Sequence, residues 1–125
     1  PNHSKAHFGL GNGLMMKGDL DLALAEYRKS AQLDPKFAFP YLNIANIQMQ
    51  TKNIPAAIEN FEKALSINPS MPTVHLSLGM VYHQFQGNNE KTLGHLKESL
   101  RLAPDQPRAE SIRSLIQELE NKQPT

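Results

Sequence analysis

The sequence predicts an all-α solenoid of three helix pairs closed by a C-terminal helix, and three observations support this fold class. A tripeptide of an apolar residue, one further residue and proline ends each repeat, which we call its close. It recurs at spacings of 34 and 35 residues, in Leu33-Asp34-Pro35, Ile67-Asn68-Pro69 and Leu102-Ala103-Pro104. A small, a large and a small residue precede each close at helical spacing: Ala23, Tyr27 and Ser30; Ala57, Phe61 and Ala64; Thr92, Leu96 and Ser99. A one-faced amphipathic segment follows the last close. Periods of this length are typical of helical repeats that pack on their neighbours.

The first element of each unit is a helix that carries a small residue, and the second begins at a polar capping residue. We expect helices at residues 4–16 and 20–33, 38–51 and 54–67, and 72–85 and 89–102. Asp19, Asn53 and Asn88 precede the second helices, where their side chains can accept hydrogen bonds from the free N–H groups of the first turn. Pro55 and Pro72 fall in first helical turns, where proline is tolerated.

The last element is predicted at about residues 107–121. Apolar residues recur there at i, i+3, i+4 and i+7, at Ile112, Leu115, Ile116 and Leu119. Such a segment has one apolar face and one polar face. Because a solenoid ends in an exposed apolar repeat, we expect this helix to cover the third pair.

This constellation resembles the tetratricopeptide repeat (TPR) family, whose 34-residue helix pair carries residues of these types in this order. The second unit fits best, with Tyr41, Ile44, Ala45, Ala57, Phe61, Ala64, Leu65 and Pro69. The first and third units have His7 and His75 at the leading aromatic position, and the third has one extra residue in the turn around Gln86–Asn89. The resemblance implies a single right-handed superhelical domain with repeats at about 4–37, 38–71 and 72–106.

Composition restricts the partners. The chain has 125 residues, no cysteine and a formal net charge of +1. A near-neutral chain without a basic block does not suit a nucleic acid or a membrane surface. No apolar run approaches the roughly 20 residues that cross a bilayer. We therefore expect a soluble chain with a protein or peptide partner, no nucleic acid and no membrane insertion. The compartment stays open, with the cytoplasm favoured.

Catalysis is not expected. The five histidines, at positions 3, 7, 75, 83 and 95, are interpreted as structural or solvent-facing residues, with no metal site and no cofactor. Gly9, Gly11 and Gly13 lack the preceding strand and the spacing of a dinucleotide-binding loop. Gly11 is instead expected to let paired helices approach closely.

A peptide-binding groove is expected where the first helices of the pairs face the hollow of the superhelix. Projected from the family's geometry, its residues are Phe8, Asn12, Met15, Phe39, Leu42, Asn43, Asn46, Met49, Leu76, Met80 and His83, with Met16 beside them. Adaptable methionines are common on surfaces that accept apolar partners. The alternative is that the terminal helix or another repeat covers these residues, or that some of them belong to the interhelical core.

Two asparagines of this face have counterparts in the family. Asn12 and Asn43 match the asparagines of the clamp that binds acidic chaperone tails, but Phe8, Thr73 and Ser77 stand where the clamp needs cations. Chaperone-tail binding is therefore not predicted. Asn43 resembles the asparagine that TPR superhelices of protein glycosyltransferases direct at a peptide backbone. We expect it on the exposed face and not between helices; a merely solvated role is the alternative.

Three functional hypotheses follow. The first is a scaffold that binds a peptide segment of a partner in the groove. The second is the substrate-recruiting module of a larger enzyme, such as a protein glycosyltransferase. The third is a self-assembly unit, because counting one repeat back from Pro35 reaches Pro1. This phase predicts a fragment of a longer array whose uncovered first helix could support a homo-oligomer.

Overall fold

The computed structural model describes residues 2–122, and within this range the chain is helical with short connections and no strand. One compact unit ends at Pro69 and the other begins at Ser70. The first contains α1 (Asn2–Lys17), α2 (Leu20–Leu33), α3 (Phe39–Gln50) and α4 (Ile54–Ile67). The second contains α5 (Pro72–Val81), the π-helical turn η1 (Tyr82–Gln86), α6 (Asn89–Leu102) and α7 (Ala109–Lys122). Each expected helix is present, and its ends lie within two residues of those predicted when α5 and η1 are counted as one helix; α5 itself ends at Val81.

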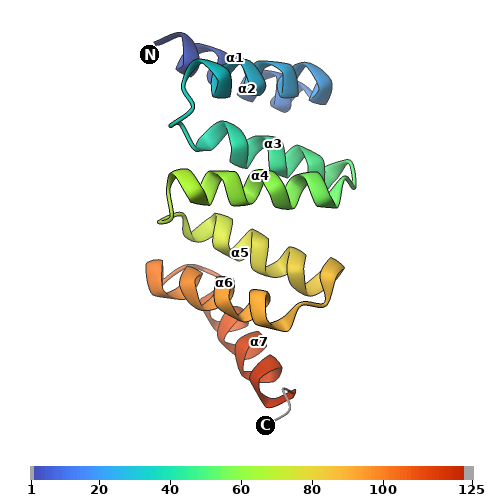
Figure 1. The fold of residues 1–125 in the computed structure, drawn as a ribbon, viewed down its shortest axis with the longest axis vertical. Helices are drawn as coiled ribbons and strands as arrows, with labels where there is room; N and C mark the ends of the chain where they lie inside the picture. The colour runs from blue at the N-terminus through green and yellow to red at the C-terminus, as the bar shows by residue number, and fades with distance from the viewer. Residues whose placement is uncertain (1, 123–125) are drawn as a thin grey trace. The chain divides into compact units, whose positions relative to one another are not determined.

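The helices of a pair lie side by side because their contact positions are small (Figure 1). A Cβ atom added at Gly11 of α1 would lie 2.7 Å from the Tyr27 ring of α2. In the second unit, a Cβ added at Gly79 would lie 2.9 Å from the Leu96 side chain. Tyr27 and Leu96 are fully or almost fully buried. The predicted role of Gly11 in close helix packing is confirmed.

The turn inside each pair has a residue with left-handed backbone. These residues are Gly18, Lys52 and Gly87, with φ of 85°, 65° and 59°. In the first unit the next backbone N–H donates back into the first helix, from Asp19 to Leu14 at 2.9 Å and from Asn53 to Gln48 at 2.8 Å. This is the hydrogen-bond pattern with which helices commonly end. The chain reverses within two residues in the first and third pairs and within three in the second.

The predicted N-cap residues are at the expected positions, but not all of their side chains make the expected hydrogen bond. Asp19, Asn53 and Asn88 each precede the second helix of a pair. Only the Asn88 side chain accepts a cap bond, from the Lys91 N–H at 3.1 Å. The side chains of Asp19 and Asn53 make no cap bond. Both residues are exposed, whereas Asn88 is partly buried, so water competes more strongly for the first two side chains.

The extra residue of the third repeat lies within the helix. The π-helical turn η1 accommodates it, because the wider hydrogen-bonded turn admits one more residue without breaking the helix. As a result the Asn88 N–H reaches the carbonyl of Tyr82, one residue further back than in the other two repeats. The helix pair keeps its register after the insertion.

The terminal helix α7 packs on α6 within the second unit. Ala109, Ile112 and Leu119 are buried, and Leu115 and Ile116 are partly buried. On the rim, Lys97 of α6 pairs with Glu120 of α7 at 2.6 Å. The segment predicted to cover the third helix pair therefore contacts it with its apolar face. None of the helices in residues 2–122 has the length and apolarity to cross a bilayer.

Candidate functional site

A pocket of about 260 Å³ opens in the first unit, on the side lined by the first helices of the two pairs. We call it the first-helix pocket. Helices α1 and α3 supply five of its residues and α2 supplies the sixth: Asn12, Met15, Met16, Asn43, Asn46 and Tyr27. The structure thus brings together Asn12, Met15, Asn43 and Asn46 of the predicted groove.

Asn12 is the centre of a hydrogen-bond network in this pocket. Its Oδ1 accepts from the Tyr27 hydroxyl at 2.6 Å and from the Asn43 amide Nδ2 at 3.1 Å. Tyr27 is 1% exposed, and burial raises the pKa of its hydroxyl, which favours the protonated, donating form. The Asn12 amide is thereby fixed in orientation by two donors from two different helices.

Two polar groups of the network make no hydrogen bond to another of the described residues. They are the Nδ2 group of Asn12, which donates, and the Oδ1 of Asn43, which accepts. An extended peptide presents the complementary pair, a backbone carbonyl and a backbone N–H. The amides of this pocket are therefore suited to a peptide main chain.

The expectation that Asn43 stands clear of interhelical contacts is wrong. It is partly buried, and its amide donates to Asn12 on the neighbouring pair. The helical periodicity of the sequence predicted on which side of the helix Asn43 lies. It could not predict the hydrogen bond to Asn12, which is 31 residues away in the chain. Asn43 therefore joins the two helix pairs as well as lining the pocket.

Phe8 and Phe39 lie apart from this pocket, in an aromatic cluster with Phe37. The Phe8 ring centroid is 5.1 Å from that of Phe37 and 6.4 Å from that of Phe39. Phe8 also packs against the core around Tyr27, as does Met15. Phe8 and Met15 therefore belong in part to the interhelical core, which was the alternative to a groove position. Phe39 remains 48% exposed.

The other predicted groove residues are at the surface of their own units. Leu42 and Met49 of α3 are partly buried. Leu76 and Met80 of α5 and His83 of η1 are partly buried in the second unit. None of the eleven predicted residues is fully buried, so each has surface that a partner can contact.

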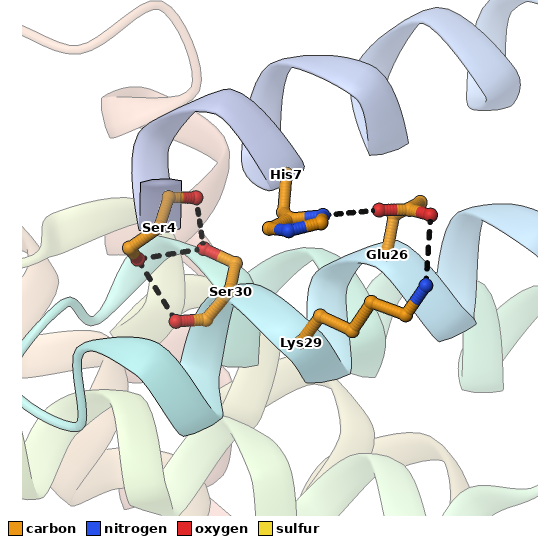
Figure 2. A network of polar contacts seen from close by, with 5 residues as sticks. All are labelled: Ser4, His7, Glu26, Lys29 and Ser30. Carbon is orange, nitrogen blue, oxygen red and sulfur yellow. Dashed lines mark hydrogen bonds and ion pairs between the residues drawn. The ribbon is translucent and has the colours of Figure 1, made fainter. Parts of the chain in front are cut away.

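A separate polar network joins α1 to α2, and sequence reasoning missed most of it (Figure 2). The buried Ser4 and Ser30 exchange hydrogen bonds, each hydroxyl donating to the other's backbone carbonyl at 2.8 and 2.7 Å. Nearby, the His7 Nδ1–H donates to the Glu26 carboxylate at 2.6 Å, and Lys29 pairs with the same group at 3.4 Å. The His7 hydrogen bond holds the pKa of Glu26 below its usual value.

The leading position of the third repeat makes an equivalent contact. His75 Nδ1 lies 3.0 Å from His95 Nδ1, so one ring donates and the other accepts. The Tyr82 ring stacks on His95 with centroids 5.9 Å apart. Like His7, His75 thus has a structural partner on the second helix of its pair.

Metal binding has one candidate that the sequence interpretation overlooked. His3 and His7 are four residues apart on α1, a spacing at which two imidazoles can share a metal ion. In the structure, Glu26 holds His7. Among residues 2–122, no group of three or more histidine or carboxylate side chains is placed to hold a metal ion.

Comparison with known proteins places the helix pairs in a family. Tetratricopeptide repeat models match residues 4–37 and 45–84. Protein CTR9 homolog of Arabidopsis thaliana is 28% identical over 83% of the chain, and Small glutamine-rich tetratricopeptide repeat-containing protein 2 of Saccharomyces cerevisiae is 30% identical over 76%. The matched segments are only 10% and 27% of those relatives' own lengths.

Solved structures show the same fold. The first TPR of Spaghetti (RPAP3), bound to the HSP90 peptide SRMEEVD, has a TM-score of 0.82 at 19% identity, covering 96% of this chain and 92% of that one. The Arabidopsis OM64 TPR domain has a TM-score of 0.82 at 17% identity, covering 94% and 96%. These likenesses agree with the all-α solenoid class that the proline period predicts. The chain belongs to the tetratricopeptide repeat family.

Proposed function

We propose that this chain is a protein–protein interaction module that holds a peptide segment of a partner against the first helices of its pairs. The observation that carries the proposal is the first-helix pocket, where methionines and asparagine amides line one hollow. The peptide-bound Spaghetti structure supports the function class, because that protein has the same fold. The residue differences at Phe8, Thr73 and Ser77 argue for a different peptide.

The pocket is proposed to take an apolar side chain of the partner beside Met15 and Met16. Met16 is 90% exposed in the absence of a partner, so a ligand can bury much of its surface. Burial of one apolar side chain contributes about 1.5–3 kcal/mol. The free Asn12 donor and Asn43 acceptor then bind the adjoining backbone, which gives orientation without dependence on sequence.

A self-assembly unit is the second candidate function. Leu10 of α1 is 53% exposed and Met16 of the same helix is 90% exposed, and a second copy could cover them. Light scattering across a range of concentrations distinguishes the candidates. Growth in mass with concentration supports self-assembly, whereas a constant mass argues against it. The role of a substrate-recruiting module in a larger enzyme depends on residues beyond this chain.

Selection from a random peptide library, followed by calorimetric titration, tests the proposal. Met16→Glu should weaken the selected peptide about tenfold or more, because it places a charge where an apolar side chain is buried. Leu22→Glu is the matched control, since Leu22 is 58% exposed on α2 and does not line this pocket. Equal affinity of Met16→Glu and the unsubstituted chain, with both folded, would contradict the proposed site.

A further inference from the structure

A second and larger pocket of about 410 Å³ lies in the first unit, where α2, α3 and α4 meet. We call it the second-helix pocket. The side chains that matter for its chemistry are Arg28 and Gln32 of α2, Tyr41 and Ile44 of α3, and Asn60 and Lys63 of α4. It shares no residue with the first-helix pocket.

Helix α3 separates the two pockets. Tyr41 and Ile44 are three residues apart and share one side of the helix. Asn43 and Asn46, which line the first-helix pocket, are also three residues apart and point to the other side. A ligand in the second-helix pocket therefore contacts neither of the asparagines assigned to peptide binding above.

The lining of this pocket is positively charged. It contains two cations, Arg28 and Lys63, and no carboxylate. Some cations of the chain pair with acids, as Arg101 does with Glu98 and Lys122 with Glu118. Within residues 2–122, no ion pair is recorded for Arg28 or Lys63. Two cations from separate helices thus converge on one hollow without a counter-charge.

Lys63 is held at the wall of the pocket. Its Nζ lies 5.6 Å from the centroid of the Tyr41 ring, a cation–π contact. This contact limits the freedom of a long side chain and lowers the entropy lost when a ligand binds it. The ammonium group still has its three N–H donors for an anion.

The rest of the lining suits a peptide rather than a bare ion. Ile44 is 3% exposed, so the hollow has an apolar floor. The Asn60 Nδ2 group donates to the Gln48 Oε1 at 2.9 Å and to the Ala56 carbonyl at 3.1 Å, which uses both of its hydrogens. The Oδ1 of Asn60 is then the atom left to accept from a ligand N–H.

We propose that the second-helix pocket binds an acidic segment of a protein partner, with an aspartate or glutamate carboxylate between Arg28 and Lys63. Guanidinium and ammonium groups form charge-assisted hydrogen bonds with carboxylates, and the arginine fork can bind both oxygens. An apolar neighbour in the segment packs on Ile44, and a backbone N–H donates to Asn60. The site is independent of the peptide site proposed above.

A synthetic probe tests this assignment on the full chain. The probe is fluorescein-labelled acetyl-Gly-Glu-Leu-Glu-Gly-amide, titrated by anisotropy at low salt, and a second peptide carries glutamine in place of both glutamates. We expect the glutamate peptide to bind more tightly and to lose affinity as salt is added. Amide shift changes in NMR spectra should gather at Tyr41, Ile44 and Asn60.

The variants separate the pocket from general surface charge. Arg28→Gln combined with Lys63→Gln should weaken the glutamate peptide about fivefold or more. Lys5→Gln combined with Lys17→Gln is the control, because it changes the net charge equally on α1, which does not line the pocket. All four residues are exposed, so both variants should keep the melting curve of the parent chain.

Three results would overturn the inference. The first is equal binding of the glutamate and glutamine peptides, or binding of neither. The second is an equal loss of affinity in the pocket variant and the control variant. The third is a set of shift changes at Asn12 and Asn43 instead of Tyr41 and Asn60. That last result would count against the second-helix pocket while leaving the function proposed for the first-helix pocket in place.

Discussion

Single backbone positions set the tight turns of the repeats, and Lys52 is the one that carries a side chain. Gly18 and Gly87 occupy the same turn position with positive φ, which glycine adopts without strain. For other L-residues this conformation costs roughly 1–2 kcal/mol, because Cβ approaches a carbonyl oxygen. The second pair therefore contains local strain that the first and third lack.

Lys52→Gly should stabilise the chain. The gain in the folded state is offset in part by the greater freedom of glycine in the unfolded state, about 0.4–1 kcal/mol. We expect a net gain of about 0.5–1 kcal/mol, measured as a higher urea midpoint with an unchanged slope. Lys52→Ala is the control, because alanine keeps the Cβ and should give no gain. A midpoint that is equally raised in both variants would show that the gain comes from the lysine side chain instead.

Glu26 gives the first unit a dependence on pH. Its pKa is lowered in the folded chain, chiefly by the hydrogen bond from His7. A lowered pKa means that the ionised group stabilises the fold above its unfolded pKa, and that this contribution disappears as the pH falls through the folded pKa. Acidification should therefore remove the contribution of this contact.

Glu26→Gln tests the sign. At about pH 7 the variant should be less stable than the parent chain, and the difference should shrink as the pH falls through the folded-state pKa of Glu26. Urea unfolding at a series of pH values from neutral to acidic measures it. Glu59→Gln serves as the control, because Glu59 is exposed and no ion pair is recorded for it. A difference for Glu26→Gln that stays constant with pH would exclude this role.

Among the elements, the terminal helix α7 depends most clearly on a neighbouring helix, α6, for its stability. Helix α7 buries Ile112 and Leu119 and packs on α6 of the same unit. Before this helix, the Gln106 side chain donates to the backbone carbonyls of Ser99 and Ala103. Isolated helices of this length are marginal in water. The stability of α7 and the covering of α6 are therefore linked.

Truncation after Pro104 should destabilise the third helix pair and promote association. The loss of α7 exposes the apolar surface that it covers, and exposed apolar patches drive aggregation. We expect a lower melting temperature and concentration-dependent light scattering. A chain with Arg113→Ala and Lys122→Ala is the control, because it removes two surface ion pairs within α7 and keeps the apolar face. A truncated chain that stays monomeric and equally stable would contradict the covering role.

The elements also show which local features the sequence could predict. The recurring prolines and small residues predicted the helix ends to within two residues, with α5 and η1 counted as one helix, because both residue types act locally on the backbone. The extra residue of the third repeat was expected in the turn but lies in η1. Either place accommodates one residue, and a linear sequence does not show which of the two the fold uses.

At the scale of the whole molecule, the candidate sites were predictable only where one helix face defines them. Helical phase placed Asn12 and Asn43 on one side, and the structure brings them together. The same phase could not show that Phe37 and Phe39 pack beside Phe8, because they come from a connection and another helix. The second-helix pocket was missed altogether. Its residues come from three helices, and only their packing brings Arg28 and Lys63 to one hollow.

Repeat architecture also predicts how the molecule unfolds. Stability in such chains is a sum of repeat terms and nearest-neighbour terms, so damage to one pair need not spread evenly. The chain divides into two compact units at Pro69 and Ser70, each with its own buried side chains. Tyr27 and Phe61 are buried in the first unit, and Leu96 is buried in the second.

Leu96→Ala should therefore act mainly on the second unit. The side chain is 0% exposed, and its removal should cost about 2–5 kcal/mol of the stability of the third pair. Hydrogen exchange read by mass spectrometry should show faster exchange in peptides from α5 and α6, while peptides from α1 and α2 keep most of their protection. Leu33→Ala is the control, because Leu33 is 47% exposed and its loss should change exchange little in either unit. If Leu96→Ala instead raises exchange equally from α1 to α7, the chain unfolds as one cooperative body and the two units are not separate in stability.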